Sequence, residues 1–184
     1  GDDGIWGGSG VDRARGGDGA DVVIVEVGGT VGDIEGLPFL EALRQLRREL
    51  GPGNTLLVHV TFLLHIGATD ELKTKPTQHS VAELRSIGIQ PDAILCRSDH
   101  EVTEDITNKI VVHCDVAERG VITLPTVSSV YEVPLILEEQ GLGDLIVETL
   151  GIGTTGRDMA GWRQMVEMIN TPKESLSIAV VGKY

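Results

Sequence analysis

Residues 22–35 read VVIVEVGGTVGDIE, and they indicate the fold class. The stretch opens with an unbroken run of β-branched residues, which is typical of a strand buried on both faces of a parallel sheet. The apolar run reaches the acid Glu26, and a glycine-rich loop that carries Asp33 and Glu35 follows. Ligands of open α/β sheets bind outside the carboxyl ends of the strands. The sequence therefore predicts an α/β protein with a ligand site at this loop.

Glu26 is a candidate Mg²⁺ ligand, because an acid at the end of an apolar strand is where P-loop NTPases hold the metal, directly or through water. The glycines of the loop allow positive φ angles and a close approach of the backbone to a ligand. The alternative is a strand followed by a flexible surface loop whose acids are only solvated. Three acids among three glycines favour the ligand site over that alternative.

Composition excludes several classes of function. The chain of 184 residues is long enough for one α/β domain, and its net charge of −13 argues against binding to nucleic acid or anionic membranes. Aromatic residues make up only 3%, which leaves few rings for stacking on bases. No apolar run approaches the ~20 residues of a membrane span, and no signal peptide opens the chain. Cys96 and Cys114 stand outside any CxxC motif, so we expect buried, reduced thiols in a cytoplasmic protein.

Helices and strands are expected to alternate after the opening strand. Pro38 suits the first turn of a helix that the Gly51-Pro52-Gly53 sequence stops, and an apolar strand follows at residues 56–62. This order predicts a right-handed βαβ unit with its two strands parallel. The further elements that we expect are helix 77–87, strand 93–97, helix 103–113, strand 121–124, and helices 133–140 and 142–150.

The two ends of the chain carry separate expectations. Residues 1–20 are rich in Gly, Asp and Arg without a period, and we expect them to be unstructured. Residues 151–156 are a linker by composition, and residues 158–169 form a connecting helix. Residues 176–184 have the pattern of the first strand of another α/β domain, which predicts that the chain is incomplete.

A basic run precedes the helix predicted at residues 77–87. Lys73 and Lys75 lie just before Thr77, which is a plausible N-cap. A helix N-terminus carries partial positive charge and free N–H groups, so two lysines beside it predict a phosphate site. The alternative is a solvated basic turn. Lys109 falls on the polar side of its helix, where spacing alone indicates solvated surface.

Four motifs together resemble the CTP synthase family. They are residues 26–35 (EVGGTVGDIE), 73–81 (KTKPTQHSV), 96–99 (CRSD) and 178–184 (IAVVGKY), and their order and separation also match, from about Asp21 to Tyr184. The resemblance implies a partial P-loop, dethiobiotin-synthetase-like parallel sheet with flanking helices. It assigns residues 21–150 to the C-terminal half of the synthetase (amidoligase) domain, residues 151–174 to an interdomain linker, and residues 175–184 to the start of a glutamine amidotransferase domain. Residues 1–20 do not match.

The resemblance also implies an activity. Members of the family are ligases in which ATP, with Mg²⁺, phosphorylates O4 of UTP, and ammonia from glutamine displaces the phosphate to give CTP. Glutamine is hydrolysed in the second domain, CTP acts as feedback inhibitor, and the enzymes are cytoplasmic homotetramers. In-line phosphoryl transfer depends mainly on positioning and electrostatics, which fits lysines and a metal around a triphosphate.

Site residues are implied by position within these motifs. The resemblance gives Glu26 to the metal, Lys73 and Lys75 to catalysis, and Pro125, Thr126 and Val127 to ATP. It gives the binding of UTP and CTP to Lys73, Thr74, Lys75, Pro76, Thr77, Gln78 and Lys109, with the 73–78 run supplied across a tetramer interface. Asp33, Ile34 and Glu35 correspond to the allosteric CTP site.

The sequence also departs from the family pattern. It contains no GxxxxGK[ST] phosphate loop, and neither cysteine stands in an amidotransferase nucleophile motif, so we expect this chain alone to be inactive. Residues 64–66 (LHI) stand where the family carries a proline and an aromatic residue. The alternatives are a non-catalytic fragment that binds pyrimidine nucleotides and another P-loop NTPase relative, such as a switch or partition protein.

Overall fold

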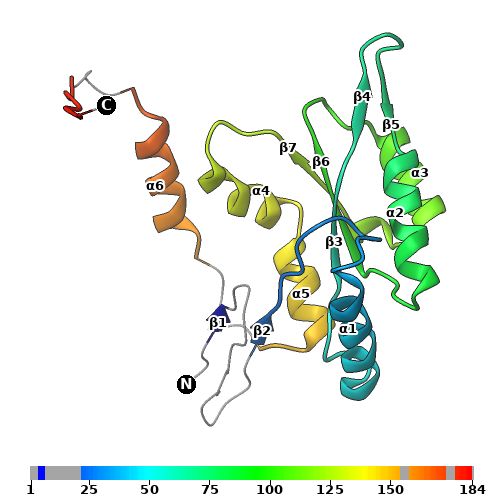
Figure 1. The fold of residues 1–184 in the computed structure, drawn as a ribbon. Coiled ribbons are helices and arrows are strands. Elements are labelled where there is room, and N and C mark those ends of the chain that lie inside the picture. The colour runs from blue at the N-terminus through cyan, green and yellow to red at the C-terminus, as the bar shows by residue number, and fades with distance from the viewer. Residues whose placement is uncertain (1–3, 7–21, 154–157, 173–176, 184) are drawn as a thin grey trace.

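A three-stranded parallel sheet forms the centre of the molecule (Figure 1). The computed structural model describes residues 4–6, 22–153, 158–172 and 177–183. The sheet has the order β3 (Val58–Phe62), β6 (Ala93–Ser98) and β7 (Val121–Pro125). Val58 pairs with Ala93, and Ile94 pairs with Val121. The predicted α/β class and these three strands are confirmed.

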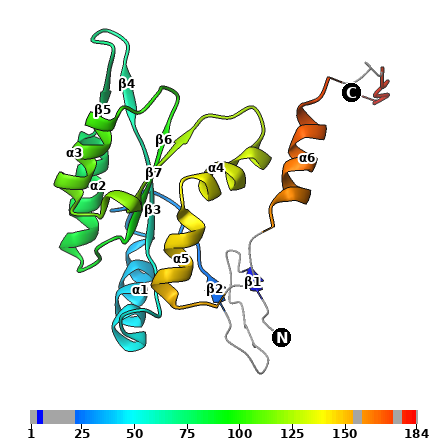
Figure 2. The ribbon, with the colours of Figure 1, turned by 180° about the vertical axis from the view of Figure 1, so that it is seen from behind.

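Helices cover both faces of this sheet, as the two opposite views show (Figures 1 and 2). Helices α2 (Lys75–Ser86) and α3 (Glu104–Cys114) connect successive parallel strands, so right-handed crossovers place both on the same face. Helices α4 (Val133–Glu139) and α5 (Leu142–Leu150) pack on the other face. Strand β6 is buried on both sides: Ile94 packs in the core with α2 and α3, and Leu95 in the core with α5.

Helix α1 (Leu37–Leu50) is tied to the beginning of the sheet. Its Arg47 makes two hydrogen bonds to the carboxylate of Asp92, at 2.7 and 2.9 Å, and that carboxylate also accepts the N–H of Leu57 at 2.7 Å. One acid thus connects α1 to the residues that begin β3 and β6. The predicted stop at Gly51 is confirmed, since this glycine has a φ of 77° that other residues rarely adopt.

A hairpin lies between β3 and α2. Strands β4 (Leu64–Ile66) and β5 (Glu71–Lys73) pair antiparallel, with Leu64 opposite Lys73. Strand β3 is an edge of the central sheet within the described part of the chain. Its side chains Val58, Val60 and Phe62 are all exposed.

The opening strand differs from its prediction. Strand β2 (Val22–Ile24) pairs parallel with β1 (Gly4–Trp6) in a separate two-stranded sheet, and Val23, Ile24 and Val25 are 55–61% exposed. The predicted burial on both faces is wrong, because no described helix covers this pair on both sides. The predicted βαβ unit is wrong as well, since β2 does not join the sheet of β3. The expectation of an unstructured N-terminal segment fails at residues 4–6.

The C-terminal region begins with helix α6 (Ala160–Asn170), so the helix predicted at residues 158–169 is confirmed, while its role as a connection between domains stays a prediction. Trp162 of α6 donates its indole N–H to the carbonyl of Tyr131 at 2.8 Å. Residues 177–183 do not form the predicted strand, and Val180 and Val181 are more than 90% exposed. A strand needs a neighbour for its backbone groups, and no described segment pairs with these residues. None of the described helices is long and apolar enough to cross a membrane.

Candidate functional site

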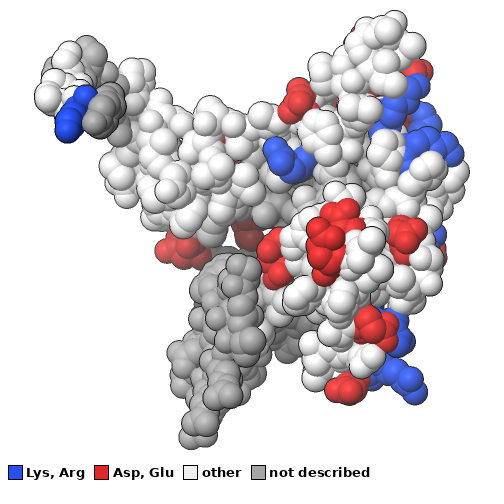
Figure 3. Space-filling view, viewed as in Figure 1, with Lys and Arg blue, Asp and Glu red and all other residues white. Residues whose placement is uncertain are grey.

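The predicted basic run lies at the junction of β5 and α2. Lys73 is the last residue of β5, Thr74 stands at the N-cap position, and Lys75 is the first residue of α2. In the space-filling view, basic side chains gather at the edge of the molecule where β5 meets α2 (Figure 3). Lys75 forms no ion pair with any residue in the described part of the chain. The junction therefore offers a positively charged group beside a helix N-terminus.

Two acids neutralise part of this charge. The ammonium group of Lys73 donates a hydrogen bond to the carboxylate of Glu71, and Lys109 of α3 donates to Asp105 at 2.6 Å. The hydrogen bond from Lys73 is the main cause that lowers the pKa of Glu71, and the positive charge of Lys109 lowers it further. Lys73 and Lys109 thus both act on the Glu71 carboxylate, although they are 36 residues apart in sequence.

Helix α2 begins earlier than predicted, and Thr77 is not its N-cap. Pro76 lies in the first turn, where its missing N–H leaves no intrahelical bond unmade. The N–H of Gln78 donates to the carbonyl of Thr74 at 3.0 Å, so the N–H groups of Lys75 and Thr77 precede the first helical bond. Such groups, together with the helix dipole, favour an anion.

The polar side chains after Lys75 dock α2 on the sheet. Thr77 is only 1% exposed, and its hydroxyl donates to the hydroxyl of Thr61 in β3 at 3.1 Å. Gln78 donates to the buried hydroxyl of Thr74 at 3.0 Å. One turn on, Ser80 lies 2.8 Å from Nε2 of His59, whose pKa is lowered by burial. At this helix terminus, therefore, the side chain of Thr77 has a structural partner, and the groups that face solvent are Lys75 and Pro76.

The glycine-rich loop of residues 26–35 is ordered by its own hydrogen bonds. The carboxylate of Asp33 accepts the N–H of Thr30 at 2.8 Å, and the N–H of Asp33 donates to the carbonyl of Thr30 at 3.0 Å. Gly29 and Gly32 have φ angles of 85° and 103°, as the loop prediction requires. Asp33, Ile34 and Glu35 are all exposed.

This loop packs near the later turns of α2, away from the lysines. Val27 and Val31 pack against the core cluster that contains Leu84, and a Cβ on Gly32 would lie 3.8 Å from Glu83. The loop that carries the residues implied for allosteric CTP thus packs beside the later turns of α2, whereas the residues implied for the triphosphate lie at its N-terminus.

Glu26 is the residue to test for the implied Mg²⁺. It is exposed just beyond β2, and no group of three or more His, Cys, Asp or Glu side chains suited to a metal occurs among the described residues. Mg²⁺ is commonly held by one or two carboxylates together with substrate phosphates. A single exposed carboxylate fits a metal that arrives with a nucleotide, and it does not fit a metal site built from protein ligands alone.

Pro125, Thr126 and Val127 lie where strands β6 and β7 end. The N–H of Thr126 donates to the carbonyl of Ser98 at 3.0 Å, and its hydroxyl donates to Asp99. Beside this edge, the rings of His65 and His100 stack with centroids 3.7 Å apart. The prediction that this segment lies at the carboxyl edge of the sheet is confirmed, and its contact with ATP stays a prediction.

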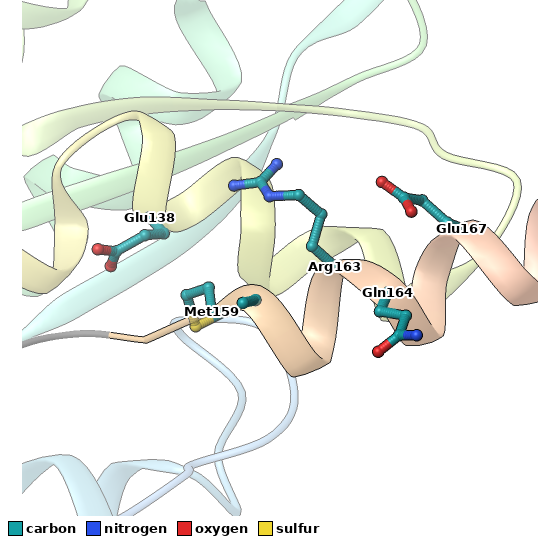
Figure 4. A pocket seen from close by; sticks show the side chains of 6 residues that line it. Glu138, Met159, Arg163, Gln164 and Glu167 are labelled. Atoms are coloured by element: carbon teal, nitrogen blue, oxygen red, sulfur yellow. The ribbon is translucent and has the colours of Figure 1, made fainter.

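Two shallow cavities lie away from the basic run. One, of about 440 Å³, lies between α4 and α6, with Glu138, Arg163 and Glu167 among the residues that line it (Figure 4). The other, of about 500 Å³, lies beside the end of α1 and includes Arg48. Neither of these two cavities is lined by a predicted site residue.

The sequence reasoning missed Glu71 and Asp105. Both were detectable from spacing: residues two apart in a strand point to the same face, which pairs Glu71 with Lys73. Residues four apart in a helix lie side by side, which pairs Asp105 with Lys109. The effect of Lys109 on Glu71 depends on how the hairpin lies relative to α3, which the sequence pattern does not specify.

Comparisons with known proteins agree on one family. A family profile described as CTP synthase N-terminus matches residues 9–152. The chain is 58% identical over 166 residues to a CTP synthase of Roseiflexus sp. (strain RS-1), a match that covers 90% of this chain and 30% of that protein. It is 59% identical over 165 residues to CTP synthases of Dehalococcoides mccartyi (strain CBDB1) and Chloroflexus aggregans, again covering 90% and 30%.

The matches cover most of this chain and a smaller part of each relative. The chain spans about 30% of the length of these curated relatives. The family match begins at residue 9, inside the segment that the sequence reasoning had set apart as residues 1–20.

Proposed function

Because this chain belongs to the CTP synthase family, we propose that it carries the pyrimidine-nucleotide triphosphate site of an amidoligase that makes CTP from UTP. The observation that supports this most directly is that Lys73 and Lys75 flank Thr74 at the N-terminus of α2, while Lys109 of α3 acts on the same Glu71 carboxylate that Lys73 binds. Three ammonium groups and the free N–H groups of a helix suit the charge and the oxygen atoms of a triphosphate.

In this proposal some residues at and near the start of α2 offset the charge of the nucleotide, and others fix the position of the helix. Lys73 and Lys75 bind phosphate oxygens of UTP or CTP and offset their charge, and Lys109 contacts the same nucleotide from α3. Thr77 holds the first turn of α2 on β3 through its bond to Thr61, so it keeps its own N–H aimed at the ligand. Thr74, Pro76 and Gln78 complete the turn that shapes the phosphate site.

The reaction that we propose is ATP-dependent amination of UTP through a 4-phosphorylated intermediate, with glutamine or ammonia as the nitrogen source. Mg²⁺, when bound, would offset triphosphate charge, and Glu26 would supply one ligand to it. Pro125, Thr126 and Val127 would line the ATP site at the carboxyl edge of the sheet. Asp33, Ile34 and Glu35 would contact CTP as a feedback inhibitor.

The remaining features follow from the family and are also proposals. They are a P-loop fold of the dethiobiotin-synthetase type and an amidoligase domain that includes residues 21–150. They also include a linker at 151–174 that leads to a glutamine amidotransferase domain from residue 175, a homotetramer whose neighbouring subunits complete the site, and a cytoplasmic location.

The test is calorimetric titration of the chain with CTP, compared with Lys73→Ala. Loss of one hydrogen bond between charged groups costs about 1.5–3 kcal/mol, so the affinity should fall by roughly 10- to 150-fold. Arg48→Ala is the matched control, since it removes a basic residue from α1, away from the α2 N-terminus. It should change the affinity less than about twofold.

Two results would contradict the proposal. Equal losses in Lys73→Ala and Arg48→Ala would show that only net charge matters. CTP binding that survives in a Lys73→Ala, Lys75→Ala double variant would place the nucleotide elsewhere. Urea unfolding of each variant checks that the fold is retained.

A further inference from the structure

Glu71 occupies an unusual place in the basic cluster. Its carboxylate accepts a hydrogen bond from Lys73 and feels the charge of Lys109, while Lys109 itself donates to Asp105. Lys73 and Lys109 thus each bind a carboxylate, and the ammonium of Lys73 already has an anionic partner before any nucleotide arrives. A carboxylate in this position imitates the phosphate that the site is proposed to bind.

We propose that Glu71 is an internal counter-ion that holds Lys73 at the phosphate position and is displaced from it when a triphosphate binds. This inference rests on the proposed nucleotide site. It assigns to Glu71 a positioning role in which Lys73 exchanges one anion for another, with no contact between Glu71 and the nucleotide. The consequence is a lower affinity for the triphosphate than the lysines would give without Glu71. In return, the side chain of Lys73 is already ordered before the triphosphate binds.

The exposure of the pair makes this exchange easy. The side chains of Lys73 and Glu71 are 39% and 55% exposed, and exposed ion pairs contribute little to stability. Strand geometry keeps Lys73 and Glu71 on one face of β5, so their ion pair can re-form when the ligand dissociates. Helix α3 contributes the second pair, Lys109 with Asp105, which is also exposed.

Other charged groups of the hairpin are engaged elsewhere. Asp70, the neighbour of Glu71, lies 3.0 Å from Nε2 of His65 in β4. Besides Lys73 and Lys109, the hydroxyl of Thr69 acts on the Glu71 carboxylate. The charge that most directly opposes an incoming phosphate at Lys73 is therefore that of Glu71.

The first experiment measures binding of inorganic tripolyphosphate to the chain at low salt. Glu71→Gln should tighten binding about two- to fivefold, the range that an exposed ion pair corresponds to. Glu49→Gln is the matched control, because it removes the same charge from an exposed position in α1 and should change affinity less than about 1.5-fold. The gain should vanish near 1 M salt, where charges are screened within about 3 Å. Unchanged or weaker binding by Glu71→Gln overturns the inference.

The second experiment follows the carboxyl ¹³C resonance of Glu71 through an acid titration. Tripolyphosphate should raise the pKa of Glu71 toward its ordinary value, because Lys73 leaves it. Lys73→Ala should raise the pKa without ligand, and the ligand should then add little. Binding without a change in this titration overturns the inference and leaves the proposed function intact. No binding by the chain or by Glu71→Gln refutes both.

Discussion

The substitution Thr77→Val tests how α2 is held on the sheet. Thr77 is 1% exposed and donates to the Thr61 hydroxyl at 3.1 Å. The Thr61 hydroxyl in turn donates to the sulfur of Cys96 at 3.9 Å, which is its one further hydrogen bond among the described residues. Valine has nearly the same shape as threonine, so the change removes a hydrogen bond without opening a cavity. The bond contributes about 1 kcal/mol, and the poorly satisfied Thr61 hydroxyl adds part of a further 1–3 kcal/mol.

We therefore expect Thr77→Val to lower the free energy of unfolding by about 2 kcal/mol. For a chain of this size, this corresponds to a fall in Tm of roughly 4–8 °C. The assay is urea unfolding followed by far-ultraviolet circular dichroism, in which the midpoint should fall and the slope m should stay constant.

The double variant Thr61→Val, Thr77→Val supplies the decisive comparison. Removing both hydroxyls leaves two apolar groups in contact, so the double variant should be more stable than the sum of the single changes by about 1 kcal/mol. Additivity within about 0.3 kcal/mol, or a Thr77→Val chain as stable as the wild type, would refute the argument that this bond docks α2.

Four further predictions concern the same fold. Ile110→Ala removes a side chain with no exposed surface and should cost about 2–5 kcal/mol in the urea assay. Asp92→Asn removes the charge that Arg47 binds and should cost about 1–3 kcal/mol in that assay. Burial lowers the pKa of His59, so the unfolded chain binds a proton at this residue more readily than the folded chain does. The urea midpoint of unfolding should therefore fall as the pH drops below about 6.5. His59→Gln should remove the part of this pH dependence that His59 causes. Burial raises the pKa of Cys96 to about 11. At pH 8 about 0.1% of this thiol is therefore thiolate, against roughly a quarter of a free cysteine. Maleimide labelling of Cys96, measured by mass spectrometry, should be at least roughly 100-fold slower in the folded chain than in the chain unfolded in urea.

Local patterns predicted most of the central layer. The helices α1, α3, α4 and α5 begin and end within one or two residues of their predicted positions, because caps, glycines and apolar spacing act over a few residues. Strand β6 was recognisable for the same reason, since its apolar run is buried on both faces. The start of α2 was misplaced because Thr77 was given a capping role, whereas Pro76 already suits the first turn.

Burial of the outer strands could not be predicted from their residues. An unbroken β-branched run indicates a buried strand only when the chain also supplies helices on both sides of it. Val23 and Val25 lack that cover in the described structure, and so do Val180 and Val181. The pattern describes what the segment requires, while its exposure depends on segments far away in sequence.

The residues of the candidate site could be predicted from the sequence, whereas the contacts between them could be predicted only in part. The lysines and the glycine loop were found from motifs, and the structure places both along α2. The partnership of Glu71 with Lys73 needed only strand spacing, whereas the approach of Lys109 needed the packing of β5 against α3. Long-range charge relations of this kind are set by tertiary structure.

The open side of β3 has a consequence for how this chain behaves in concentrated solution. Within the described part of the chain, no strand pairs with the outer side of β3, and the side chains Val58, Val60 and Phe62 are exposed. The five residues of β3 include no lysine, proline or acid that would discourage pairing with another copy. A net charge of −13 keeps copies apart at low ionic strength. Added salt shortens the range of that repulsion, so light scattering should rise with both salt and protein concentration. Charge repulsion between copies is therefore what we expect to oppose this self-association, and added salt should weaken it.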